Sequence, residues 1–275
     1  MKQSIKNTVN TLLLSAGILG SSFTFATPSV DEIVNRTNFV AYYQGQDGKA
    51  KVKMTITDEQ GRERTRQFVI LRSDEPQTDS LKDNAYKGEQ KMYVYFSRPA
   101  DVNKMVFMVW KRPGGTDDRW LYLPALDLVK RIASSDKRTS FVGSDFYYED
   151  VSGRNLEDDT HELISTDENY YVIKNTPVKP ELVEFSYYTM YIHKETFLPI
   201  QTEYYDKKGN LYRTNQTLKV DTIAGFPTVT QSSMENLKTK TKTLMEYSKV
   251  SYNLDLPKEI YTERFLRKAP RKLLR

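Results

Sequence analysis

The chain has 275 residues, with 41 Lys and Arg against 36 Asp and Glu, which gives a formal net charge of +5. It contains no Cys, which excludes disulfides, thiolate metal sites and Cys nucleophiles, and only two His, so no metal centre or other cofactor is expected. With 28% charged and 38% hydrophobic residues, the composition is typical of a globular body and not of an integral membrane protein.

Residues 1–26 have the pattern of a cleaved signal peptide. Two lysines form a positive start, residues 11–25 carry no charge, and Thr24-Phe25-Ala26 places small residues where a signal peptidase reads them. The apolar stretch is too short to span a bilayer, and no Cys follows it to accept a lipid. We therefore predict a mature, unlipidated domain over residues 27–275, free in the bacterial periplasm.

The first element of the mature chain is predicted to be a helix over residues 30–42. Ser29 is placed to cap this helix, and Glu32, three residues on, completes a capping box. The apolar residues that follow recur at helical spacing until Gly45 ends the pattern.

From residue 51 onward the hydrophobic period changes from 3.6 to 2, which indicates strands. Polar turns at residues 58–61 and 206–210 predict hairpins, and residues 104–111 are apolar on both faces, which predicts a strand covered on both sides. We expect about eleven strands, antiparallel because most connections are short. Residues 137–142 are also expected to be extended.

Two further helices are predicted, and they define the expected architecture. Residues 125–135 have apolar side chains three to four apart, which predicts a short helix or a helical turn, and residues 257–266 follow a proline that suits a first helical turn. The predicted fold class is mainly β, with one strongly curved antiparallel sheet in a single domain. We expect these two helices to cover its concave face.

Few residues support catalysis. The chain has no Gly-x-Ser-x-Gly motif, and its two histidines, His161 and His193, lie in polar surroundings typical of surface residues. Asp145, Glu149 and Asp150 cluster in sequence, but carboxylates in a loop are usually solvated or cap backbone amides. We therefore expect that the protein is not an enzyme.

The last twelve residues carry six positive charges and no acid. They form either a frayed, solvated tail or a surface that attracts anionic lipid headgroups or an acidic partner. The two lysines before residue 27 contribute a charge of +2, and the last twelve residues contribute +6. The net charge of the body between them is therefore 5 − 2 − 6 = −3. The net basicity is therefore no argument for nucleic-acid binding. The six predicted contact residues are Arg264, Arg267, Lys268, Arg271, Lys272 and Arg275.

Three sequence blocks resemble the signature of a LolA-like family of outer-membrane lipoprotein-sorting proteins. They are Arg119-Trp120-Leu121-Tyr122-Leu123-Pro124, Ser140-Phe141-Val142-Gly143-Ser144-Asp145-Phe146 and Gly225-Phe226-Pro227-Thr228. The resemblance covers essentially the whole mature chain. It implies an incomplete barrel of about eleven antiparallel strands, closed by helices around an apolar cavity.

The resemblance also implies a function. A LolA-like protein would hold lipid or lipoprotein acyl chains in its cavity and pass them between membranes, with transient contact to a membrane surface and with an inner-membrane RND-type exporter as a partner. A related fold serves an RseB-like periplasmic sensor, so an accessory protein-binding subunit without transport of its own is the alternative.

The alternating apolar residues provide a prediction for the cavity lining, since hydrocarbon needs no hydrogen bonds from its walls. A core filled by its own side chains gives the same alternation, so the pattern leaves both readings open. The segment 141–146 is predicted to form the rim, through Phe141, Gly143, Asp145 and Phe146. The predicted lipid-binding residues are Met54, Ile56, Phe68, Ile70, Met92, Val94, Phe96, Phe107 and Trp120.

Overall fold

The computed structural model describes residues 27–75, 89–112 and 114–275. The predicted signal peptide lies outside the described residues. The described residues form one antiparallel sheet of thirteen strands and three short α-helices. The strands are β1 (Asp47–Thr57), β2 (Glu63–Asp74), β3 (Gln90–Arg98), β4 (Val106–Lys111), β5 (Asp118–Leu123), β6 (Leu128–Arg131), β7 (Asp159–Thr166), β8 (Tyr170–Pro177), β9 (Phe185–His193), β10 (Pro199–Asp206), β11 (Leu211–Ile223), β12 (Phe226–Asn236) and β13 (Thr241–Tyr252).

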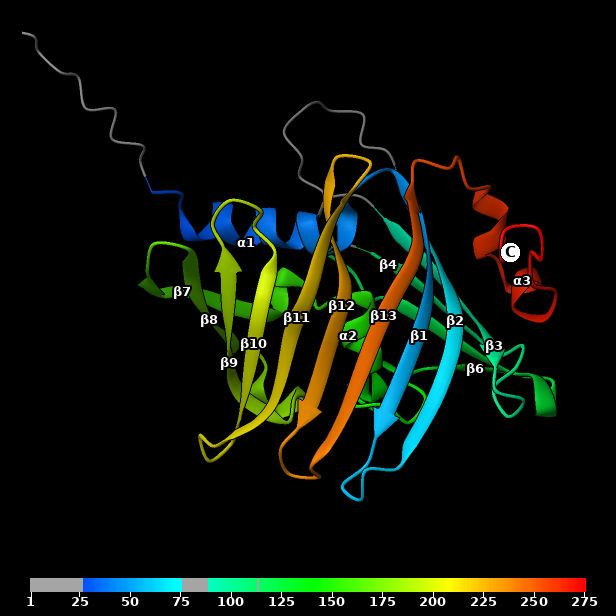
Figure 1. The fold of residues 1–275 in the computed structure, drawn as a ribbon, viewed down its shortest axis with the longest axis horizontal. Helices are drawn as coiled ribbons and strands as arrows, with labels where there is room; N and C mark the ends of the chain where they lie inside the picture. Colours follow the sequence, from blue (N-terminus) through cyan, green and yellow to red (C-terminus); the bar gives the residue numbers. More distant parts are fainter. Residues whose placement is uncertain (1–26, 76–88, 113) are drawn as a thin grey trace, which may run out of the picture.

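The order of the strands follows the chain with one exception. The sheet runs β6-β5-β4-β3-β2-β1-β13-β12-β11-β10-β9-β8-β7, so the first strand pairs with the last and both edges come from the middle of the chain. The sheet is open and does not close into a barrel. It curves strongly around α1 and α2 (Figure 1). The predicted mainly-β class and single antiparallel sheet are confirmed, but the predicted count of eleven strands is too low.

The region predicted as a short helix or helical turn over residues 125–135 is not one helix: 3₁₀ turns at Pro124–Leu126 and Ser134–Asp136 flank the four-residue strand β6. Pro124–Leu126 form one 3₁₀ turn, Asp127 adopts a left-handed conformation with φ 44°, and the chain reverses into β6. β6 pairs with β5 from Leu123↔Leu128 to Trp120↔Arg131. The prediction was wrong because apolar residues three to four apart in a strand can face opposite sides of a sheet. Residues 137–142 form a loop that contains one isolated bridge, between Ser140 and Tyr147, and not the expected strand.

Helix α1 (Val30–Asn38) begins as predicted, because the Glu32 amide donates to Ser29 Oγ at 3.1 Å. A π-helical segment, Phe39–Tyr43, continues it and brings the helical region close to the predicted end. Ile33 of α1 is fully buried in an apolar cluster formed with β8 and β9. α1 therefore lies across the concave side of the sheet (Figure 1).

Both faces of β2, β3 and β4 are apolar, and different segments cover them. On the concave face, Phe68 and Phe96 pack under Phe141, in the loop that precedes the short helix α2 (Tyr148–Ser152). On the convex face, Leu71 and Tyr93 pack under the C-terminal segment. The prediction that β4 is covered on both sides is confirmed, since all four residues from Val106 to Val109 are buried.

The C-terminal segment lies on the convex face of the sheet, and not on the concave face as expected (Figure 1). It contains a 3₁₀ turn, Lys258–Tyr261, and helix α3 (Glu263–Arg267), separated at Thr262, so the predicted closing helix is interrupted. The apolar side chains of β2–β4 that face away from α2 explain this placement, because they need a cover of their own.

Candidate functional site

A cavity of about 370 Å³ lies between the concave face of the sheet and the segments that cover it. One wall is apolar, with Phe68 and Ile70 from β2, Met92 from β3 and Met245 from β13. Across the cavity, Met190 of β9 continues the apolar lining. Methionine side chains are flexible and adapt to ligands of variable shape.

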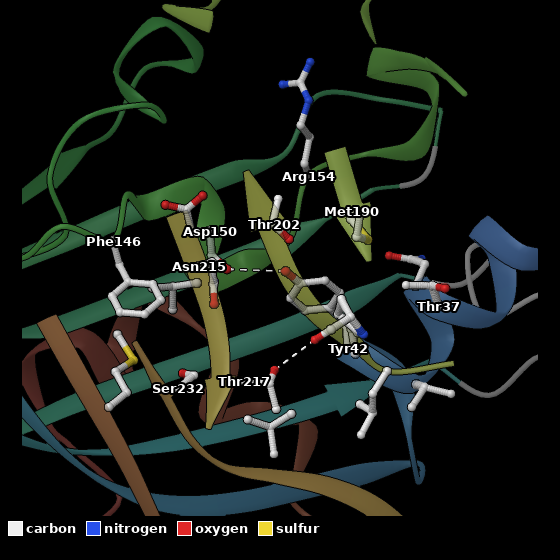
Figure 2. A pocket seen from close by; sticks show the side chains of 18 of the residues that line it. Thr37, Tyr42, Phe146, Asp150, Arg154, Met190, Thr202, Asn215, Thr217 and Ser232 are labelled. Carbon is white, nitrogen blue, oxygen red and sulfur yellow. Dashed lines mark hydrogen bonds between the residues drawn. The ribbon is translucent and has the colours of Figure 1, made fainter. Parts of the chain in front are cut away.

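Short polar side chains leave this space open on the strands β10, β11 and β12. Thr202, Asn215, Thr217 and Ser232 line the cavity where the neighbouring strands carry Phe or Met (Figure 2). Thr217 Oγ1 donates to the Pro199 carbonyl at 2.9 Å, so its polar atom is satisfied within the wall. Because these side chains are small, the sheet and the segments that cover its concave face do not touch here, and the cavity between them stays open.

Asn38 on α1 carries a buried hydrogen-bond donor that has no acceptor among the described residues. It lines the cavity at 5% exposure, and its Nδ2 finds no acceptor within the described part of the chain. Gln44, a few residues on, is different, because its Nε2 donates to the carbonyls of Val40 and Pro227 at 2.7 and 2.9 Å. A buried donor without an acceptor costs free energy, about 1–3 kcal/mol.

Tyr42 crosses the cavity beside this donor. Its hydroxyl reaches towards the Asp150 carbonyl, 3.5 Å away (Figure 2). Burial raises the pKa of the Tyr42 phenol well above its ordinary value, with smaller contributions from Tyr204 and Asp150. The phenol therefore stays neutral and offers the cavity a ring face and a hydroxyl.

A buried ionic network closes one end of the cavity. Glu149, with a side chain that is 1% exposed, pairs with Lys137, Arg138 and Arg154 at 2.8, 3.1 and 3.3 Å. Burial acts to raise the pKa of the Glu149 carboxyl, but Arg138, Arg154 and Lys137 outweigh it and lower the pKa to about 2. Glu149 thus stays ionised and paired, which is unsuited to proton transfer near neutral pH.

The other carboxylates and both histidines are also engaged. Asp150 pairs with the fully buried Arg213, and Asp145 accepts from Thr243 Oγ1 at 2.7 Å. His161 lines the cavity, but its Nδ1 and Nε2 lie 2.7 and 3.1 Å from Asn175 Oδ1 and the Leu156 carbonyl. The His193 Nδ1 lies 3.1 Å from Thr196 Oγ1. The described residues contain no cluster of three or more acidic or histidine side chains that could hold a metal ion.

Comparisons with known proteins agree with this architecture. A family model described as an uncharacterized protein matches residues 88–268, more than half of the chain. The structure of a DUF1329 family protein from Desulfovibrio piger is 27% identical with a TM-score of 0.75, and the match covers 87% of this chain and 100% of that one. The chain belongs to a LolA-like family.

Two further structures resemble this LolA-like protein. A putative outer membrane lipoprotein-sorting protein domain from Vibrio parahaemolyticus is 25% identical with a TM-score of 0.72, covering 86% of this chain and 96% of that one. A LolA superfamily protein from Nitrosomonas europaea shares the fold, at 19% identity and a TM-score of 0.63, covering 87% and 100% of the two chains. No curated protein matches the sequence.

The predicted lipid-binding residues of the LolA-like protein fall into three groups. Phe68, Ile70 and Met92 line the cavity. Trp120 lies on the opposite face of the sheet, packed with Trp110 against the cover of the convex side. The remaining five are buried in the packed core on the concave side, beneath the 141–146 loop, and are Met54, Ile56, Val94, Phe96 and Phe107.

The four residues predicted for the rim have different positions. Phe146 lines the cavity, whereas Phe141 is fully buried in the core. Gly143 is exposed in a left-handed turn with φ 80°, and Asp145 ties this turn to β13. Sequence reasoning missed the polar lining on β10–β12 and Asn38. The sequence signal for this lining is a run of short polar side chains at alternate positions of β10–β12.

No helix among the described residues is long and apolar enough to cross a membrane. The six C-terminal cations lie outside the cavity lining, in the segment on the convex face.

Proposed function

We propose that this LolA-like protein is a periplasmic carrier that holds lipid or lipoprotein acyl chains in the cavity and passes them between membranes. The observation that carries the proposal is an apolar cavity on the concave face that the protein's own side chains leave open. Its family, which includes proteins with the same fold described as lipoprotein-sorting, supports this assignment.

The free energy of such binding needs no covalent chemistry. Removing a methylene group from water contributes about 0.8 kcal/mol, so a modest length of acyl chain is enough for tight holding.

The cellular context forms part of the proposal. The signal-peptide pattern of residues 1–26 supports secretion to the periplasm, and the family resemblance supports an inner-membrane RND-type exporter as the donor or acceptor of the cargo. Co-purification of such an exporter with the tagged, mature protein tests this partnership, and a cargo-loaded protein that never co-purifies with it would remove the exporter from the proposal.

The central experiment is to purify the protein gently, extract it with organic solvent and identify the extract by mass spectrometry. We expect a lipid or an acylated peptide in a stoichiometric amount. An empty protein that also fails to bind a fluorescent fatty-acid probe would refute carriage and favour the protein-binding sensor.

The matched variants are Asn215→Phe and Gln216→Phe on adjacent positions of β11. Asn215 lines the cavity, whereas Gln216 is exposed on the other side of the strand. A phenyl ring in the cavity displaces the equivalent of about three methylene groups, so Asn215→Phe should weaken binding of the probe roughly 50-fold. Gln216→Phe should leave binding unchanged, and equal effects of the two variants would contradict the assigned cavity.

A further inference from the structure

The C-terminal segment is fixed on the convex face of the sheet by specific contacts. Trp110 Nε1 donates to the Tyr261 carbonyl and Tyr93 Oη donates to the Phe265 carbonyl, both at 2.8 Å. Leu273 and Leu274, near the end of the chain, pack against the same apolar cluster of β2–β4. The basic segment is therefore an ordered part of the surface, and the alternative of a frayed tail does not apply to it.

All six cations of this segment point to solvent. Arg264, Lys268, Arg271, Lys272 and Arg275 are exposed, and none of them forms an ion pair with the residues that the structure describes. Arg267 is the exception, with Asp127 Oδ1 and Glu263 Oε1 at 3.2 and 3.6 Å from its guanidinium. Because residues 264–275 contain no acidic side chain, the positive charges of the other five residues are not compensated within the segment.

Two protruding leucines lie at the margin of these cations. Leu126 is 70% exposed and Leu128 45% exposed. They flank Asp127, which the ion pair with Arg267 places against α3. The 3₁₀ turn at Pro124–Leu126 and the left-handed Asp127 hold both leucines at the free edge of the sheet.

We propose that this surface docks the protein on an anionic phospholipid bilayer. We call it the basic end, and it consists of Leu126, Leu128, Arg264, Arg267, Lys268, Arg271, Lys272 and Arg275.

Unpaired cations are attracted to anionic headgroups, and exposed leucines beside them enter the headgroup–acyl boundary. The combination favours a bilayer over an acidic protein, because an acidic partner surface would use the cations and leave the two leucines in water. The basic end lies on the opposite face of the sheet from the cavity, so docking leaves the cavity free to hold cargo.

The test is sedimentation of the full mature protein with vesicles of phosphatidylcholine alone and with added phosphatidylglycerol. We expect binding to the anionic vesicles only, decreasing as salt is raised, since the attraction is screened. Absence of binding to anionic vesicles at low salt would overturn the proposal.

A triple variant, Lys268→Ser/Arg271→Ser/Lys272→Ser, tests the assigned surface. Each Lys or Arg contributes about 1 kcal/mol, or about fivefold, to partitioning near an anionic surface, so we expect the loss of three to be on the order of 100-fold. The control, Lys179→Ser/Lys208→Ser/Lys242→Ser, removes the same charge from exposed positions elsewhere. Equal losses in the two variants would show that net charge alone attracts the protein and would overturn the assignment.

The leucines distinguish a bilayer from an acidic protein. We expect Leu126→Ser/Leu128→Ser to weaken vesicle binding at least several-fold while leaving binding to soluble poly-glutamate unchanged. Unchanged vesicle binding would overturn the bilayer in favour of an acidic macromolecule. Thermal unfolding of each variant confirms that it is folded, and Asn215→Phe should retain full vesicle binding, which separates docking from the carriage of cargo.

Discussion

Replacing Phe141 by Ala is expected to cost the fold about 4–5 kcal/mol, the upper part of the range for truncating a buried Phe. Phe141 is fully buried, and four rings surround it at centroid distances of 5.5 to 5.9 Å. These are Phe68, Phe96, Phe107 and Tyr148, which join β2, β3 and β4 to α2. The facing strands cannot collapse into the space because the sheet holds their spacing, so the void would persist.

Urea and thermal unfolding measure this loss. At about 2–4 °C per kcal/mol for a chain of this size, the melting temperature should fall by roughly 8–20 °C. Phe226→Ala is the control, because Phe226 is half-buried and makes one edge contact with an aromatic ring of the described residues, Tyr252 at 5.0 Å, so it should lose about 1–2 kcal/mol. A loss below about 2 kcal/mol for Phe141→Ala would refute the packing argument.

Two further predictions concern the cavity and its ionic wall. Asn38→Leu removes a buried donor without an acceptor, so it should stabilise the protein by about 1 kcal/mol in urea unfolding, with the exposed Asn35→Leu as control; a variant that is no more stable than wild type would contradict the assignment of an unsatisfied donor. Glu149→Gln should cost about 3 kcal/mol at pH 7, because folding lowers the pKa of Glu149 from 4.5 to about 2. The ionised carboxylate stabilises the fold above pH 4.5, and this contribution is lost as the pH falls towards 2, so about half of the difference between wild type and variant should be gone by pH 3 in urea unfolding. A difference that stays constant from pH 7 to pH 3 would contradict this assignment.

The cavity shows why only part of the site is predictable. The alternation in β2 and β3 correctly placed Phe68, Ile70 and Met92 on the concave face. The same alternation holds for Val94 and Phe96, which are sealed in the core by Phe141. Whether an inward-facing side chain meets a cavity or another side chain depends on the segment opposite to it, and the period of its own strand carries no information on that segment.

The sequence by itself determined the local features of this protein. The cap at Ser29, the hairpin strands and the two-sided burial of β4 follow from residue type and spacing, because each depends on neighbours a few residues away. Only the tertiary structure decided which segments meet. Arg213 pairs with Asp150, 63 residues earlier in the chain, and the C-terminal segment lies against Tyr93, on the convex face. Such contacts depend on the curvature of the whole sheet and on which uncovered faces remain, and these are properties of the assembled chain.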